Sequence, residues 1–453
     1  MKTPVNMTSS APLNAPESLQ ETGFNTPQMR RILASSFIGS AIEFYDFILY
    51  ATAASLVFNK VFFTNLDPAV AIFASFATLA VGYLARPLGG IVFGHFGDKL
   101  GRKGVLITSM LMMGIATTLI GLLPPTAQVG MLAPIALIVL RIVQGLAVGG
   151  EWGGAMLMAL EHSPKERRGF AASFANMGGP AGAVMATLAV SAVSVLPNDQ
   201  FLSWGWRIPF LISIVLIAIG LVIRLKVSES PLFLALENKA EEKKIPLMEV
   251  LTKYPMSVIK GTLVGMSSYT VQGLMTVWAI SFVVDSAGMD RTAVLNVKAV
   301  GATLTVVGIW YAARYSDKLG RRPVMFAGII TGAVMALPIM WMLQLGELWL
   351  FAIALFVANG IIQAAIFGPF GAFSAELFPT RIRYTGASLV YQLSSTLGAG
   401  FTPMIVSGLV LATGGALWLT GVVWAATFVI AGLCLLRVKE GKDQDLSAEN
   451  IKQ

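Results

Sequence analysis

Charged residues, cysteine and histidine are all scarce in this chain of 453 residues. Only 12% of the residues are Asp, Glu, Lys or Arg, whereas a soluble domain averages roughly 25%. The single cysteine, Cys434, can form no disulfide within the chain, and its apolar surroundings are typical of a small packing residue. The histidines, His95 and His162, fall at predicted loops, and no G-x-x-x-x-G-K-[ST] phosphate loop occurs. The sequence therefore argues against a soluble protein, an ATP-driven pump and a membrane enzyme, and we expect neither a cofactor nor a metal.

Apolar residues dominate what is present. They make up 55% of the chain, and the mean hydropathy is +0.73. Four long stretches carry no charge at all: residues 104–140, 169–198, 324–346 and 384–436. Each provides one or two spans of the roughly 20 residues that cross a bilayer. This pattern predicts an all-α polytopic membrane protein.

Twelve transmembrane helices are predicted. The first six lie near residues 32–58, 68–96, 105–123, 130–159, 169–196 and 207–226. The second six lie near 256–284, 292–313, 324–345, 347–373, 384–411 and 415–436. The predicted domains are a disordered tail (1–29), an N-terminal six-helix bundle (30–227), a linker (228–255), a C-terminal six-helix bundle (256–436) and a charged tail (437–453).

Basic residues gather in the loops on one side of this arrangement. They occur at 30–31, 98–103, 165–168, 318–322 and 381–383 and in the linker and the C-terminal tail. The positive-inside rule therefore predicts that both termini are cytoplasmic. The net charge of +8 has the same explanation, so the lipid bilayer and not a nucleic acid is the expected partner.

One charged, glycine-punctuated loop occurs twice. Gly94-His-Phe-Gly-Asp98-Lys99-Leu-Gly101-Arg102-Lys103 follows the second span, and Ala313-Arg-Tyr-Ser-Asp317-Lys318-Leu-Gly320-Arg321-Arg322 follows the eighth, 219 residues later. Two copies in equivalent places indicate two related halves. The loop is either a basic topological anchor or a gate in which Asp98 pairs with a neighbouring helix end in one state only.

Two acids stand within the first apolar span. Glu43, Asp46 and Tyr50 are spaced i, i+3 and i+7, which places them on one helical face. Burial in hydrocarbon is costly for a carboxylate, so such residues usually face a cavity or a partner. One of the two acids is a candidate proton carrier, and the alternative is a structural acid paired with a basic group.

The fourth span adds Arg141, Gln144 and Glu151, with glycines that allow close helix packing. Arg141 is either the partner of Glu43 or Asp46, or an anchor for a substrate carboxylate, whose geometry matches its fork. Glu151 is the further candidate for proton coupling. Arg86, in the second span, either lines the cavity or stabilises a neighbouring helix end.

The second half has lost these charges. A 215-residue offset places Asn359 over Gln144 and Phe356 over Arg141. Candidate substrate ligands are therefore polar and uncharged: Asn359, Gln363, Tyr391 and Gln392, with Tyr269 and Gln272. Each is alternatively a helix-packing polar group. Lys298, near the outer end of the eighth span, is expected to snorkel to the interface.

These motifs carry a resemblance. The loop at 94–103 resembles the signature of the major facilitator superfamily, and the copy at 313–322 departs from it only in beginning with Ala. The chain is further similar to the metabolite:proton symporter family in four segments: Glu43-Phe-Tyr-Asp46-Phe; Ala85-Arg86-Pro87-Leu-Gly89-Gly90; Arg141 to Gln144 with Gly149-Gly150-Glu151-Trp152-Gly153-Gly154; and Ser203-Trp-Gly-Trp206-Arg207. The resemblance implies two pseudo-symmetric six-helix bundles around a central site that opens to each side in turn.

The expected function is secondary active import of a small polar metabolite, an organic acid, by proton symport. Members of the resembled family carry shikimate, dicarboxylates, tricarboxylates or betaines. The resemblance places the chain in a bacterial inner membrane, where we expect it to act as a monomer. The alternatives are a proton-coupled efflux antiporter of amphipathic compounds and a symporter of a zwitterionic solute.

Overall fold

The computed structural model describes residues 26–100, 102–149, 152–161, 163–225, 246–379 and 382–442. The side chains of residues 93–106 fall outside this description. The predicted gating residue Gly101 and the predicted coupling residue Glu151 therefore lie outside the described residues, and Gly94, Asp98, Lys99 and Arg102 are placed only as parts of helices.

Six spans form the N-terminal half. The long helices are α1 (Pro27–Leu56), α3 (Pro68–Leu100), α4 (Arg102–Leu122), α6 with α7 (Leu132–Val148 and Trp152–Glu161), α8 (Arg168–Ser194) and α10 (Arg207–Leu225). Short pieces between them are α2 (Phe58–Val61), α5 (Thr126–Val129), η1 (Lys165–Arg167), α9 (Asn198–Gln200) and η2 (Phe201–Gly205). Helix α1 begins at Pro27 because the Thr26 side chain accepts a hydrogen bond from the Met29 amide and Pro suits the first turn.

Six spans also form the C-terminal half. Three of them are single helices: α15 (Arg291–Leu319), α16 (Arg321–Gln344) and α21 (Trp418–Leu436). The seventh span consists of α13 (Pro255–Val271), η3 (Gln272–Trp278), α14 (Ala279–Ser281) and η4 (Phe282–Ser286). The tenth consists of α17 (Leu348–Phe356), η5 (Val357–Gln363) and α18 (Ala364–Glu376), and the eleventh of α19 (Arg383–Ser395), η7 (Thr396–Gly400) and α20 (Thr402–Ala412). Within the predicted linker, α12 (Pro246–Lys253) is helical and buries Val250 against the core.

The predicted spans are confirmed as helices. Eleven helices of the described part are long and apolar enough to cross a membrane, and Ile107–Leu122 is a shorter apolar helix at the third span. No strand occurs among the residues that the structure describes. The fold is therefore the predicted all-α polytopic one.

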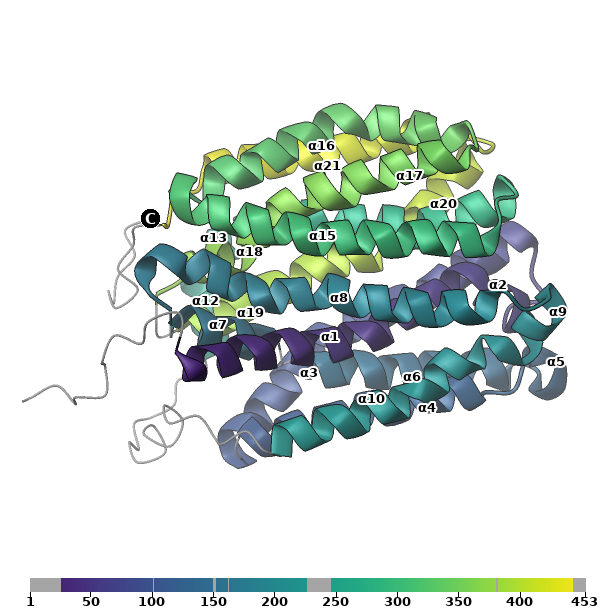
Figure 1. Cartoon of the computed structure of the whole chain (residues 1–453), viewed down its shortest axis with the longest axis horizontal. Coiled ribbons are helices and arrows are strands. Elements are labelled where there is room, and N and C mark those ends of the chain that lie inside the picture. The colour runs from purple at the N-terminus through teal and green to yellow at the C-terminus, as the bar shows by residue number, and fades with distance from the viewer. Residues whose placement is uncertain are drawn as a thin grey trace, which may run out of the picture.

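The two halves lie against each other along their length (Figure 1). Across the boundary, α8 contacts α15 and α18, while α3 contacts α19, η7 and α20. Helix α1 packs against η3 and α14, and α7 against α19. We call the end where α1 begins and α21 finishes the tail end, and the end where α1 finishes and α15 begins the far end (Figure 1).

Glycines set the helix crossings inside each half. A Cβ on Gly145 of α6 would overlap the carbonyl oxygen of Gly82 of α3, and one on Gly308 of α15 would overlap that of Gly360. Gly145 and Gly360 are related by the same 215-residue offset that aligned the fourth and tenth spans. A Cβ on Gly82 would also collide with the Arg141 side chain. The close crossing therefore needs glycine, and it makes room for Arg141.

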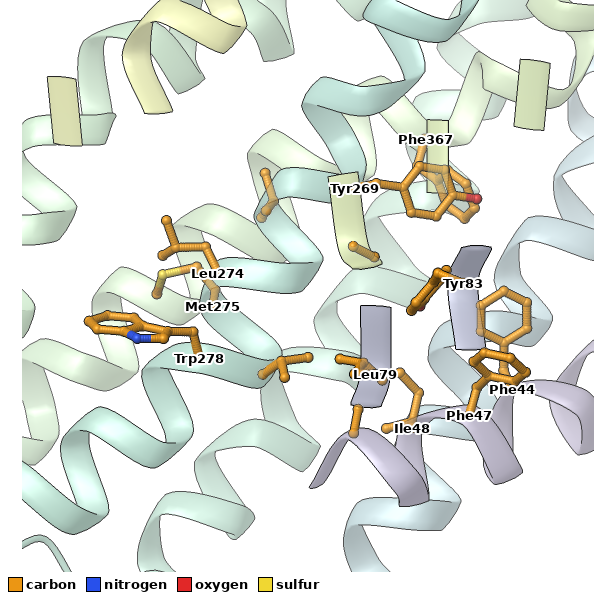
Figure 2. Packing of buried hydrophobic residues seen from close by; sticks show 14 of the residues in the cluster. Phe44, Phe47, Ile48, Leu79, Tyr83, Tyr269, Leu274, Met275, Trp278 and Phe367 are labelled. Carbon is orange, nitrogen blue, oxygen red and sulfur yellow. The ribbon is translucent and has the colours of Figure 1, made fainter. Parts of the chain in front are cut away.

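The apolar core is continuous across the boundary between the halves. Figure 2 shows side chains of both halves in this cluster: Phe44, Phe47, Ile48, Leu79, Tyr83, Tyr269, Leu274, Met275, Trp278 and Phe367. The polar side chains described next lie within this apolar surrounding.

Candidate functional site

The two acids of α1 are both buried, but they have different surroundings. Asp46 accepts a hydrogen bond at Oδ1 from the Ser213 hydroxyl of α10 at 2.8 Å. Its Oδ2 has no hydrogen-bond partner among the described residues. Glu43 lies near Tyr391, across the boundary between the halves. Asp46 therefore belongs to the interior of the N-terminal half, whereas Glu43 faces the C-terminal half.

Arg141 is fully buried in the described structure. Its Nη1 donates to Gln144 Oε1 at 3.1 Å. Its Cζ lies 4.2 Å from the ring centroid of Phe47 and 4.0 Å from that of Tyr50. Its Nε and Nη2 atoms lack hydrogen-bond partners within the described part of the chain. The hydrogen bond seen for Arg141 is thus to an amide, and the predicted pairing with Glu43 or Asp46 is not the arrangement in this state.

Gln144 links Arg141 to the neighbourhood of Asp46. Its Nε2 donates to the Thr117 hydroxyl of α4 at 2.7 Å, and Thr117 lies beside the Asp46 carboxyl group. Tyr50 is held separately, because its hydroxyl donates to Thr78 at 2.7 Å. A short polar chain therefore connects the buried guanidinium to the buried acid.

Arg86 of α3 is a second buried guanidinium, with 1% of its surface exposed. Its Cζ lies 3.7 Å from the centroid of Phe47 and 4.4 Å from that of Tyr83. Its Nε and Nη2 atoms also find no hydrogen-bond partner among the residues described. An unsatisfied donor is expensive to bury, and more so on a charged group. Arg86 and Arg141 both lie over the Phe47 ring, and an anion bound beside them would be stabilised by their unsatisfied donors.

Polar groups of the C-terminal half face these arginines. Tyr391 stacks on Trp152 of α7, with ring centroids 3.7 Å apart and planes inclined by 15°. It also meets Tyr269 edge to face at 5.7 Å. Both tyrosines lie near Arg86, and their hydroxyl groups lie close to each other. These phenol groups are candidate ligands for a hydroxylated or anionic substrate.

The predicted amides behave differently from one another. Gln392 donates from Nε2 to the Gly149 carbonyl across the boundary at 3.0 Å. Asn359 and Gln363 are buried in η5, and the Asn359 Oδ1 atom lacks a partner among described residues. The structure thus joins Gln392 to the N-terminal half, and it gives no such contact for Asn359 or Gln363.

Three spans of the C-terminal half contain π-helical turns at these positions. Gln272 opens η3, Asn359 and Gln363 lie in η5, and η7 follows Gln392 by a few residues. Such turns are frequent at functional sites because the widened helix redirects side chains and frees backbone groups. The sequence signal that accompanies each turn is a glycine: Gly273, Gly360 and Gly398.

Known proteins are similar to this chain in sequence and in fold. A family profile described as Major Facilitator Superfamily matches residues 36–403 and 302–452. This chain belongs to the Major Facilitator Superfamily. In Escherichia coli (strain K12), the inner membrane metabolite transport protein YhjE is 40% identical over 425 residues, which cover 92% of this chain and 95% of that protein. The shikimate transporter of the same organism is 38% identical over 417 residues, covering 91% and 95%.

Among solved structures, the D-xylose-proton symporter is similar with a TM-score of 0.69 at 18% sequence identity, covering 91% of this chain and 98% of that one. This likeness supports the fold alone. The curated relatives, by contrast, are named as transporters and not as enzymes. The chain is therefore a polytopic membrane transporter of the superfamily.

The second copy of the signature motif is not a loop as predicted, since it forms the end of α15 and the start of α16, and it joins the halves at the tail end. The Asp317 carboxylate accepts hydrogen bonds from the amides of Gly169 at 2.9 Å and Phe170 at 2.8 Å, in the first turn of α8. Arg321 contacts Asp317 at 2.6 Å and Glu376 at 3.2 Å. A carboxylate at a helix N-terminus is stabilised by the free amides and the helix dipole. The contact of Asp317 with α8 must therefore break if this end opens, and Arg321 pairs with Asp317 within the C-terminal half.

The sequence does not decide the role of Arg86 and does not single out Trp152, and the position predicted for Lys298 is wrong. Lys298 does not snorkel to the interface: it is 2% exposed, and its Nζ donates to the Thr52 hydroxyl of α1 at 2.7 Å. The expectation was wrong because α15 turns this residue toward the other half and not toward lipid. For Arg86 and for Lys298, the signal in the sequence is an ionisable residue inside an apolar span.

Proposed function

We propose that this transporter imports a small organic anion, such as shikimate or a di- or tricarboxylate, together with a proton. The observation that carries the proposal is the pair of buried guanidinium groups, Arg86 and Arg141, each with two nitrogens that find no partner among the described residues. Arginine suits this role because its planar fork matches a carboxylate. The 38% identity to a shikimate transporter agrees with this substrate class.

The uncharged wall of the same site supports a hydroxylated substrate. Tyr269 and Tyr391 place phenol groups where the field of Arg86 reaches them. Together with Tyr50, Gln144, Asn359, Gln363 and Gln392, they would bind the hydroxyl groups of an organic acid. Arg141 is the main carboxylate anchor of this proposal.

Asp46 is the proposed proton carrier, with Glu43 and Glu151 as further members of the coupling group. Binding of a substrate carboxylate would reorganise Arg141 and its partner Gln144, and the change would reach Thr117 beside Asp46. A change in local charge shifts the proton affinity of a neighbouring carboxyl group, so the two events are linked.

Alternating access would use the contacts between the halves as two gates. At the tail end Asp317 joins α15 to α8, and at the far end Lys60 pairs with Asp285 at 2.6 Å. In alternating access, the contacts at the tail end and those at the far end do not break at the same time. We propose that the tail end is cytoplasmic, that Gly94, Asp98, Lys99, Gly101 and Arg102 form a matching gate in the first half, and that one chain suffices.

The test is uptake into proteoliposomes with an imposed pH gradient. Shikimate and citrate should accumulate when the outside is acidic, and a protonophore should abolish the accumulation. Neutral xylose and zwitterionic betaine should not compete. Accumulation that persists without a proton gradient would exclude proton symport. Competition by betaine alone would favour a zwitterionic solute, and substrate expulsion under the same gradient would favour an efflux antiporter.

A further inference from the structure

Lys298 is a buried ionisable group for which the mechanism above has no use. It lies on the third turn of α15, in a helix that spans the membrane. Its neighbours Val294, Leu295, Ala299 and Ala302 are all buried and apolar. The hydrogen bond that the structure gives its ammonium group is to Thr52, on α1 of the other half.

No ion pair to Lys298 is formed by the residues that the structure describes. The Thr52 hydroxyl is neutral and already donates to the Ile48 carbonyl at 2.7 Å. An ammonium group has three donors, so two remain without a partner among the described residues. Burial of a charge without a counter-ion is costly, and an ionisable residue inside a membrane span is therefore a functional site by default.

Lys298 belongs to a row of contacts that α15 makes with the N-terminal half near the far end. Along α15, Arg291 donates to the Ser194 carbonyl, Thr292 meets the Ser194 hydroxyl, and Asn296 accepts from Ser191. The hydrogen bond from Lys298 to Thr52 comes next along α15 and lies furthest from the start of this helix. All of them separate when α15 moves away from α8 and α1.

Opening of the far end would therefore uncover an ammonium group in a newly hydrated entrance. We propose that Lys298 is an entry site for the carboxylate of the substrate, occupied before the anion passes inward to Arg141. Thr52 replaces the anion as the partner of Lys298 when the far end closes. This inference rests on the proposed anionic substrate and adds a second binding position for it.

A purely structural role makes a different prediction. If Lys298 only holds the closed far end, then removing either partner of the Lys298–Thr52 hydrogen bond should have the same effect. If Lys298 receives the substrate, only loss of the ammonium group should weaken uptake from the far side. Lys298→Met and Lys298→Arg, with Thr52→Val as the matched control, separate these roles.

The experiment measures initial uptake of shikimate and of citrate by cells and, from the other side, by inverted membrane vesicles. Lys298→Met should raise the KM for entry from the far side about tenfold and leave the KM from the tail side unchanged, because a charge at an entrance acts mainly on association. Thr52→Val should change kcat and not KM. Lys298→Arg should restore most of the affinity. Added salt should raise the wild-type KM and have little effect on Lys298→Met.

The outcomes distinguish failure of the proposed entry site from failure of the proposed function. Equal effects of Lys298→Met and Thr52→Val, or equal effects on both sides of the membrane, would overturn the entry site while leaving anion transport intact. Wild-type protein that takes up betaine or xylose and neither acid would overturn the proposed function, and the entry site with it. A far-side KM effect that is specific to Lys298 and depends on salt supports the proposal.

Discussion

The guanidinium groups of Arg86 and Arg141 lie over the same phenyl ring, at 3.7 and 4.2 Å from the centroid of Phe47. They come from different helices, α3 and α6, which cross at Gly82 and Gly145. An aromatic face attracts a cation, but it cannot satisfy the in-plane N–H donors. The shared ring therefore holds two cations near each other and leaves donors on both for a ligand.

Replacement of either arginine by lysine should weaken substrate binding despite the retained charge. An ammonium group does not stack as a plane and cannot form a bidentate contact. Loss of a charged hydrogen bond is worth about 2 kcal/mol, or roughly thirtyfold in affinity. Binding of shikimate and citrate to purified Arg86→Lys and Arg141→Lys should be compared by calorimetry with Arg437→Lys, whose side chain is exposed at the end of α21. Wild-type affinity in both site variants would exclude the arginine anchor.

Asp46→Asn should abolish uphill accumulation and preserve exchange of substrate across the membrane. The amide resembles the protonated acid, and its oxygen can still accept from Ser213. Exchange needs both orientations of the carrier but no net proton movement. Proteoliposomes loaded with substrate provide both measurements. Asp67→Asn, at an exposed loop position where Asp67 accepts from the Ala69 amide, is the control. If Asp46→Asn still accumulates substrate, Glu43→Gln becomes the next variant to measure.

Asp317→Ala should shift the transporter toward the state that is open at the tail end. The change removes the acceptor for the Gly169 and Phe170 amides and one partner of Arg321, contacts worth about 2–3 kcal/mol in all. Turnover should fall, while substrate affinity should change much less.

A disulfide formed across the tail end reports this shift directly. A Cβ on Gly153 would lie 3.3 Å from the Ser388 Cβ, close to the roughly 3.5–4.5 Å of a disulfide. In a Cys434→Ser background, the pair Gly153→Cys and Ser388→Cys should cross-link rapidly with an oxidant and block transport until reduced. Adding Asp317→Ala should slow the cross-linking, whereas Asp199→Ala, at the far end, should not. Equal rates in both would leave Asp317 without a gating role.

Gly145→Ala should destabilise the protein, and Gly408→Ala should not. The new methyl at 145 would overlap a backbone oxygen of α3, which cannot rotate away, whereas nothing lies within 4 Å of a Cβ at 408. Overpacking of this kind costs about 1–3 kcal/mol, while Gly to Ala in an open helical position gains about 0.5–1 kcal/mol. Thermal unfolding in detergent compares the two. A Tm unchanged by Gly145→Ala would mean that the helices can separate there without cost.

The sequence determined the class of structure and several members of the site. Backbone groups cannot remain unpaired in hydrocarbon, so long uncharged stretches must become helices, and the twelve spans follow from composition alone. Acids and arginines are rare in such stretches, and this made Glu43, Asp46 and Arg141 visible without any coordinates. The repeated loop likewise pointed to Asp317 and Arg321.

Only the tertiary structure decided which of these groups meet. Helical spacing put Glu43 and Asp46 on one face, yet packing places Asp46 with Ser213 and Glu43 near Tyr391 of the other half. Lys298 meets Thr52 across 246 residues of sequence. Such pairs depend on the rotation of each helix about its axis and on the depth at which it crosses its neighbours. Close approach at Gly82 and Gly145 fixes both quantities for α3 and α6, and no spacing within a single helix encodes them.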